Sequence, residues 1–262
     1  VFGSSHALHA VNPECARTLK FWNASFVSGD AMMDYYAYMG LRKRWPQREG
    51  QCVLLNEDFW LGMLQTEYTI YFAQITILHE VMSMPYRCRW LMWPYERVVR
   101  KLLATNLPAV SKRGYVRSLG ENGKTAQERC LGHIKFLKHR PTELAWLEKL
   151  RAQVEADGRH LIFFRTPLDD DYRKVFETFR ERAWAICSKV RAGLPVLDYS
   201  ATLPPSERCF ADADHLSPEG ACWFTPLLES DLLALGFQTK EVQTCPAFSK
   251  IQDKSVDGSA TL

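Results

Sequence analysis

Three residues of this sequence have side chains that could act together as a nucleophilic triad. Ser5 stands near the beginning, and Asp212 and His215 stand in the stretch DADHLSPEGA near the end. A serine hydroxyl is a poor nucleophile until a base, most often a histidine held by a carboxylate, takes its proton. An aspartate three residues before a histidine lets a single turn present both side chains. The three residues form a triad if the fold brings Ser5 beside His215.

A nucleophilic serine also needs hydrogen-bond donors for the oxyanion that develops during the reaction. Three donors are available after the first three expected strands: the Ser5 N–H at a helix start, the Gly29 N–H and the Asn56 side-chain amide. The missing Cβ of Gly29 would allow a close approach. Gly29 could equally be a turn residue and Asn56 a helix cap, and both alternatives stay open.

The elements that must position these residues alternate between strand and helix. We expect strands over 1–2, 19–27, 52–55, 160–166 and 194–199, and helices over 7–18, 31–38 and 171–192. This order predicts an α/β fold of parallel β-α-β units with helices on both faces of the sheet. Ligands of such sheets bind at the carboxyl ends of the strands, which is where the predicted site residues fall.

Residues 60 to about 145 depart from this alternation because they are rich in aromatic residues and helical in period. With 262 residues, 47% of them hydrophobic, the chain can bury one large core. We therefore expect a single domain over 1–262 with a helical insertion at 60–145. The aromatic stretch 90–95 within it is either insertion core or a carbohydrate platform, and core packing is favoured because Trp and Tyr most often bury.

Composition excludes several classes of function. The net charge of +3, with acids and bases nearly balanced, predicts no nucleic-acid partner. No apolar window is long enough to span a bilayer, and no signal peptide opens the sequence. Val1-Phe2 looks like the tail of a strand, so we expect any targeting segment or membrane anchor to lie upstream. The 8 cysteines include no C-x-x-C pair, which argues against structural zinc, and their disulfide pairing stays open.

Other residues compete for the roles in the triad. Asp214 could replace Asp212 as the partner of His215, but adjacent residues point apart, so Asp212 is favoured. His6 follows Ser5 and is more readily a substrate contact or a surface residue than the base. Four further histidines have no partner at a useful spacing and are interpreted as structural or solvated: His79, His133, His139 and His160.

Four parts of the sequence resemble the four sequence blocks of the SGNH (GDSL-like) hydrolases: Gly3-Ser4-Ser5, Gly29, Asn56 and Asp212-x-x-His215. Gly3-Ser4-Ser5 and DADHLSPEGA are most similar to a branch of cell-envelope acyl-transfer proteins, which includes the D-alanyl transfer protein of teichoic acids and the alginate acetylation proteins. Ser4 stands where the family usually has aspartate. Leu55-Asn56-Glu57-Asp58 replaces the usual Gly-x-Asn-Asp of the third block.

The resemblance implies a flavodoxin-like three-layer sandwich with a parallel sheet of about five strands. It implies that Ser5 is the nucleophile, His215 the base and Asp212 the orienting acid, with Ser5, Gly29 and Asn56 as oxyanion donors. The implied activity is that of a serine esterase or O-acyltransferase that acts on an acylated saccharide or a cell-envelope acyl carrier, without a metal or cofactor. The implied location is extracytoplasmic or membrane-associated.

Two rival functions remain. The altered third block is compatible with a non-catalytic relative that binds a polysaccharide or a protein partner through the same cleft. A doubly wound nucleotide-binding domain could instead use Gly3-Ser4-Ser5 as a phosphate turn. The sequence contains neither G-x-G-x-x-G nor a P-loop, which disfavours the nucleotide-binding interpretation.

Overall fold

A computed structural model describes residues 1–25, 31–42, 52–57, 115, 118, 124–135, 141–180, 188, 191 and 193–237. Gly29, most of the predicted insertion and its aromatic stretch 90–95 lie outside these residues. Within the described part, no helix is both long and apolar enough to cross a membrane.

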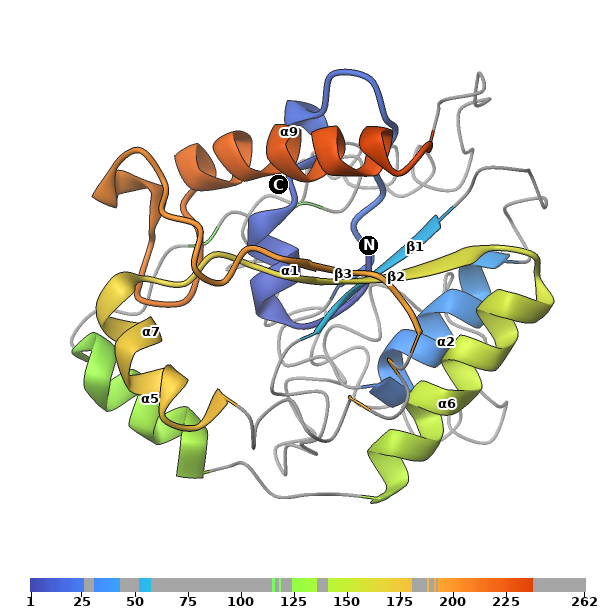
Figure 1. Cartoon of the computed structure of the whole chain (residues 1–262), viewed down its shortest axis with the longest axis horizontal. Coiled ribbons are helices and arrows are strands. Elements are labelled where there is room, and N and C mark those ends of the chain that lie inside the picture. The colour runs from blue at the N-terminus through green and yellow to red at the C-terminus, as the bar shows by residue number, and fades with distance from the viewer. Residues whose placement is uncertain are drawn as a thin grey trace, which may run out of the picture.

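The centre of the fold is a parallel sheet with strand order β1-β2-β3 (Figure 1). The strands are β1 (Cys52–Asn56), β2 (His160–Arg165) and β3 (Val196–Asp198). Asn56 pairs with Phe164, and Arg165 pairs with Asp198. The first two strands are nearly continuous apolar runs because both of their faces are buried. These strands confirm the predicted parallel α/β arrangement.

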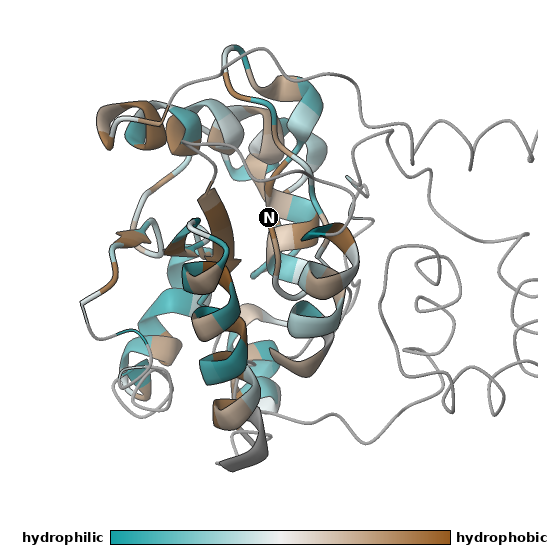
Figure 2. Cartoon of the chain, turned by 90° about the vertical axis from the view of Figure 1, so that its right-hand side faces the viewer, coloured by the Kyte–Doolittle hydropathy of each residue, from teal (hydrophilic) through white to brown (hydrophobic). Residues whose placement is uncertain are grey.

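Helices cover both faces of this sheet. On one face, α2 (Ala31–Arg42) and α6 (Pro141–Ala156) share a buried cluster with alternate strand residues such as Leu55 and Phe163. On the other face, α1 (Ser5–Ala10) and α9 (Pro218–Ala234) pack with Leu54, Ile162 and Phe164. Figure 2 shows apolar strand segments inside the molecule and helices that mix hydrophilic and apolar residues around them.

Two further helices, α5 (Ala126–Lys135) and α7 (Asp170–Glu177), pack against each other to one side of the sheet (Figure 1). Their contact buries a small cluster of Cys130, Leu168, Tyr172 and Phe176. Asp169 caps α7 by accepting hydrogen bonds from the N–H groups of the first turn. The α5 helix falls inside the range 60–145 that the sequence assigns to an insertion.

Several predicted boundaries are wrong. The first helix ends at Ala10, before a 3₁₀ turn η1 (Pro13–Cys15), because proline starts this turn and Asn12 caps it. The second helix continues to Arg42 rather than ending at residue 38. In place of the helix predicted over 171–192, the structure has a helix that begins at Asp170 and ends at Glu177. Most of residues 181–192 lie outside the described part.

The described part of the strand predicted over 19–27 is irregular. Ala24 N–H still donates to the carbonyl of Val1 at 2.8 Å, so the segment runs beside the first residues. No strand is assigned to residues 19–25, and hydrogen bonds from side chains also hold this segment in place. The Asn23 amide donates to the carbonyls of Ala7 and Val11, each at 2.9 Å, and thereby caps the end of α1. These side-chain bonds hold the segment in addition to its backbone contact with Val1.

A disulfide between Cys15 and Cys222 joins η1 to α9 across a sequence separation of 207 residues. Cys52, Cys130 and Cys209 are free thiols. The sequence alone left this pairing open because no spacing pattern distinguishes one cysteine from another.

Candidate active site

Ser5, His215 and Asp212 form one continuous hydrogen-bonded chain. His215 Nε2 lies 2.8 Å from Ser5 Oγ, and His215 Nδ1 lies 3.0 Å from each carboxylate oxygen of Asp212. The two ring nitrogens of His215 therefore face the hydroxyl and the carboxylate separately. This is the geometry that a histidine needs in order to take a proton from a serine while an aspartate orients it.

The turn before α1 places Ser5 at the start of the helix. Gly3 has φ +134°, and an added Cβ would lie 2.6 Å from the Asn56 Cβ, so only glycine fits this approach to β1. Ser4 is 2% exposed and caps α1 by accepting the His6 N–H at 3.3 Å. The two neighbouring serines thus differ in role, because Ser4 Oγ lies against His6 and Ser5 Oγ lies against His215.

The loop that carries Asp212 and His215 is fixed by its own backbone. Asp212 Oδ1 accepts the N–H groups of Asp214 at 3.2 Å and His215 at 2.9 Å, which forms an Asx turn. Ser217 then caps α9 by accepting the Gly220 N–H at 3.1 Å, with Pro218 in the first helical position. The histidine is therefore held between a closed turn and a helix start.

Asp212 is the nearer acid partner of His215. Asp214 Oδ1 lies 3.7 Å from His215 Nδ1, against 3.0 Å for Asp212. Burial opposes ionisation of Asp212, but the hydrogen bond and the charge of His215 outweigh it and lower the pKa of the carboxyl. Because an unprotonated Nδ1 would face a carboxylate at this distance, the Nδ1–H tautomer is favoured, and it leaves Nε2 free to accept the Ser5 proton.

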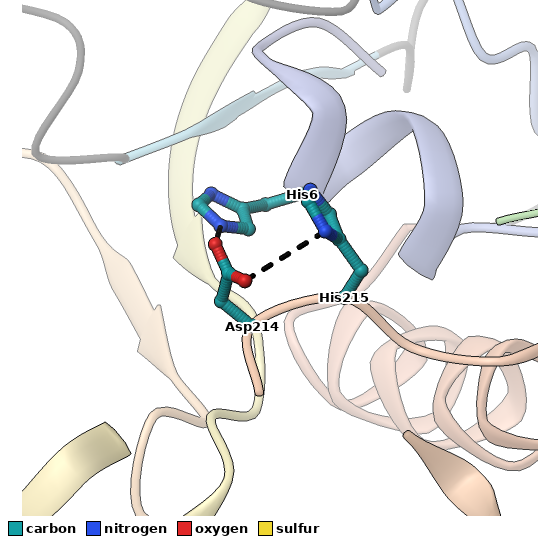
Figure 3. A group of neighbouring side chains, drawn as sticks. All are labelled: His6, Asp214 and His215. Carbon is teal, nitrogen blue, oxygen red and sulfur yellow. Dashed lines mark hydrogen bonds and ion pairs between the residues drawn. The ribbon is translucent and has the colours of Figure 1, made fainter. Parts of the chain in front are cut away.

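A second group of charged residues lies against the triad. Figure 3 shows Asp214 between the rings of His6 and His215, and His6 Nε2 is 2.8 Å from Asp214 Oδ2. Arg129 Nε donates to the other oxygen of Asp214, and Arg129 Nη2 lies 3.1 Å from His215 Nδ1. Arg129 comes from α5, and no motif or spacing in the sequence indicates that it belongs here.

The interpretation of His6 as a surface residue is wrong, and its interpretation as a substrate contact stays a prediction. His6 is 3% exposed because the first turn of α1 points it towards Asp214. Burial opposes ionisation of Asp214, but the charges of His215, His6 and His133 and the His6 hydrogen bond hold its pKa well below the ordinary value. Asp214 is therefore a buried carboxylate rather than a solvated loop acid. His133 also has a partner, the Tyr172 hydroxyl at 2.7 Å.

His6, Asp214 and His215 bring three potential metal-ligating atoms within 4.8 Å of one another. The Arg129 guanidinium already contacts Asp214 and approaches His215 Nδ1, so a positive charge is built into this cluster. A divalent cation at the same place would be repelled by it. The arrangement is better suited to an ion-pair network than to a metal centre.

The structure describes two of the three predicted oxyanion donors, the Ser5 N–H and the Asn56 amide. The Ser5 N–H belongs to the first turn of α1, whose amides have no acceptor within the helix. Asn56 is buried beside Gly3, and its amide donates to the Phe164 carbonyl at 3.2 Å, which uses one of its two hydrogens. Gly29 lies outside the described residues. The donor roles of all three remain predictions.

No protein-family model matches this chain, and comparisons with curated proteins and with solved structures find no match either. The resemblance to the SGNH hydrolases therefore stays a prediction that depends on four short sequence blocks. What the site does must be inferred from the geometry of its own side chains.

Proposed function

We propose that the protein is a serine-dependent acyl ester hydrolase or O-acyltransferase of the SGNH type. The observation that carries this proposal is the chain from Ser5 Oγ through His215 to Asp212, with contacts of 2.8 and 3.0 Å. These residues lie far apart in the sequence, and their two halves meet at the end of the sheet where ligands of α/β proteins bind. The proposed chemistry uses protein groups alone and requires no cofactor.

The proposed reaction has two halves. In the first, Ser5 Oγ bonds to the acyl carbon of an ester while its proton moves to His215 Nε2, and the leaving alkoxide then takes that proton. Ser5 is left acylated. In the second half, water or an acceptor hydroxyl gives its proton to His215 and attacks the acyl carbon, and His215 returns that proton to Ser5 Oγ as the bond between Oγ and the acyl carbon breaks. Asp212 stabilises the imidazolium that forms in both halves.

The backbone supports the finer fold that the resemblance implies. Phe2 pairs in parallel with Leu55 of β1, and Val1 exchanges backbone hydrogen bonds with Trp22 and Ala24 on its other side. The resulting order, 22–24, 1–2, β1, β2, β3, is that of flavodoxin-like sheets. We therefore propose a three-layer sandwich with a sheet of five segments. We also propose that the helical insertion ends before α6, which packs on the sheet.

The substrate class and the location rest on the resemblance. It favours an acylated saccharide or a cell-envelope acyl carrier, and an extracytoplasmic or membrane-associated location. The Cys15–Cys222 disulfide supports an extracytoplasmic location, because such bonds persist mainly in oxidising compartments.

Labelling with a fluorophosphonate probe, mapped by mass spectrometry, tests the proposed function. We expect an adduct on Ser5 in the wild type, none in Ser5→Ala, and a labelling rate lower by at least about 100-fold in His215→Gln, because the base is lost. Ser206→Ala and the exposed His160→Gln are matched controls and should label as the wild type does.

An absence of any adduct on the folded wild type would overturn the proposed function. Binding of an acylated saccharide by that unreactive protein would then favour the non-catalytic binding module. An adduct on Ser4 would contradict the assignment of Ser5 as nucleophile. With a labelled acyl ester as donor, acyl transfer to an added saccharide in preference to water would identify a transferase.

A further inference from the structure

The surroundings of His215 contain one carboxylate more than a triad requires. Asp212 and Asp214 have side chains that are 7% and 1% exposed, and both lie within 3.7 Å of His215 Nδ1. Each nearby carboxylate favours the charged form of a histidine. Two buried carboxylates together favour the imidazolium over the neutral ring, and a protonated histidine cannot take the proton of Ser5.

Arg129 supplies the opposing charge at the same place. Its side chain is 7% exposed, its Nε donates to Asp214, and its Nη2 lies 3.1 Å from His215 Nδ1 and 3.7 Å from Asp212 Oδ2. Because the favoured tautomer has a proton on Nδ1, the guanidinium and this ring nitrogen present donors to each other. This donor–donor contact is present in both charge states of the ring, and the positive charge of the guanidinium is what disfavours the imidazolium.

We propose that Arg129 is a positioning residue that keeps His215 a usable base, because its guanidinium, anchored on Asp214, offsets the second carboxylate beside the imidazole. This inference deepens the proposed acyl-serine function, and the role of Arg129 in catalysis rests on that function. The residue touches neither the nucleophile nor a reacting atom, and it acts through His215. An arginine delivered by α5 thus connects the predicted insertion to the chemistry.

The balance of charge around His215 gives the direction of each effect. With neutral histidines, the two carboxylates and the guanidinium leave one negative charge, which an imidazolium on His215 would cancel. Without Arg129 two negative charges would remain, and without the Asp214 charge there would be none. The groups that face this network come from α1, α5 and the loop before α9: Ser5, His6, His9, Arg129, His133, Asp212 and Asp214.

NMR titration of the histidine rings in the full chain tests this balance without requiring activity. The His215 signals are assigned by their loss in His215→Gln. We expect Arg129→Gln to raise the pKa of His215 by about 1 or more, because a positive charge is lost from its immediate surroundings. Asp214→Asn should lower it. Arg129→Lys should stay near the wild type, and the double variant Arg129→Gln/Asp214→Asn should return towards it.

An unchanged or lowered pKa of His215 in folded Arg129→Gln would overturn the inference, since a purely structural arginine would not move this pKa upwards. If that variant does not fold, Asp214→Asn and the double variant decide. The inference then fails if Asp214→Asn does not lower the pKa, or if the double variant does not lie closer to the wild type than Asp214→Asn does.

The same variants separate this inference from the proposed function. In Arg129→Gln the acid limb of fluorophosphonate labelling should move to higher pH by the same amount as the pKa of His215. Suppose that the pKa of His215 rises in Arg129→Gln and falls in Asp214→Asn, but wild-type Ser5 takes no label. This result would support the role of Arg129 and overturn the esterase or transferase activity. A label on Ser5 with no shift of His215 would do the reverse.

Discussion

At the scale of single residues, Ser4 and Ser5 show how a position in a turn decides the chemistry of a side chain. The Ser4 hydroxyl is buried and accepts the His6 N–H at the start of α1. The Ser5 hydroxyl is one residue further on, inside the helix, and lies 2.8 Å from His215 Nε2. Helix capping thus occupies one serine and leaves the next one for the histidine. The same turn sends His6 inward to Asp214.

We predict that Asp212→Asn lowers the rate of Ser5 labelling by about 10³- to 10⁴-fold, because an amide no longer favours the Nδ1–H tautomer of His215 or stabilises its charged form. Asp171→Asn, whose side chain is 77% exposed, is the matched control and should leave the rate unchanged. The measurement is the second-order rate of fluorophosphonate labelling at neutral pH. Retention of a tenth of the wild-type rate by Asp212→Asn would mean that Asp214 serves as the partner instead.

A pH-dependent contribution to stability is expected from Asp214. The pKa of this carboxyl in the folded protein lies well below its ordinary value of about 3.9. Its contribution is therefore fully present above the unfolded pKa, and it is lost as the pH falls below about 4 through the folded pKa. Asp214→Asn should lower the free energy of unfolding at pH 7 by about 3 kcal/mol, because it leaves buried charges without their partner.

Urea unfolding from pH 7 down to the lowest pH at which both proteins fold measures this effect. The difference between the wild type and Asp214→Asn should shrink below pH 4. A difference that stays constant over the whole range would contradict an ionised Asp214, and a difference near zero at pH 7 would contradict its role in the network.

At the scale of elements, the approach of α9 to the loop before it fixes the position of His215. A Cβ added to Gly220 would lie 2.0 Å from the Cys209 carbonyl oxygen, and Ser217 N–H donates to the same carbonyl at 2.9 Å. The first turn of the helix therefore rests directly on backbone. Because Asp212 and His215 lie between these contacts, a shift of α9 would move the histidine away from Ser5.

We predict that Gly220→Ala lowers the free energy of unfolding by about 1–3 kcal/mol, because the helix must move to relieve the overlap. Labelling of Ser5 at a temperature where the variant is folded should slow as well. Gly132→Ala is the matched control, because nothing lies within 4 Å of its added Cβ and it sits in α5, where alanine stabilises a helix. Equal stabilities of the two variants would contradict the close packing at Gly220.

The sequence predicts an element best when a pattern within the element itself determines its structure. The apolar runs of β1 and β2 were located to within one residue, because strands buried on both faces are continuous in hydrophobicity. The segment 19–27 is rich in aromatic residues and was also expected to be a strand. Asn23 and the distant Glu229 hold its described part by side-chain bonds, and no local pattern predicts this. Arg129 was missed for a similar reason, because only the packing of α5 on α7 brings it to the site.

At the scale of the whole molecule, cross-links join an early segment of the described chain to α9. The Cys15–Cys222 disulfide joins η1 to α9, and the buried Glu229 carboxylate accepts the backbone N–H groups of Arg17 and Thr18 at 2.9 and 2.6 Å. Ser5 lies on the helix that leads into η1, and His215 lies just before α9. The connections that stabilise the fold therefore also hold the two halves of the triad together.

We predict that reduction of this disulfide lowers the free energy of unfolding by about 2–4 kcal/mol, because the unfolded chain regains the freedom of a loop of more than two hundred residues. Thermal unfolding with and without dithiothreitol measures the change. At 25 °C the reduced protein should still label on Ser5, since Glu229 and the packing of α1 on α9 remain. On heating, labelling should fail together with the fold and not before it.

The double variant Cys15→Ser/Cys222→Ser separates this bond from any other effect of the reductant. It should unfold at the temperature of the reduced wild type, and dithiothreitol should leave it unchanged. If dithiothreitol lowers the unfolding temperature of the double variant as much as that of the wild type, the stabilising bond is not Cys15–Cys222. Loss of Ser5 labelling at 25 °C, with the fold intact, would instead show that the bond positions the triad directly.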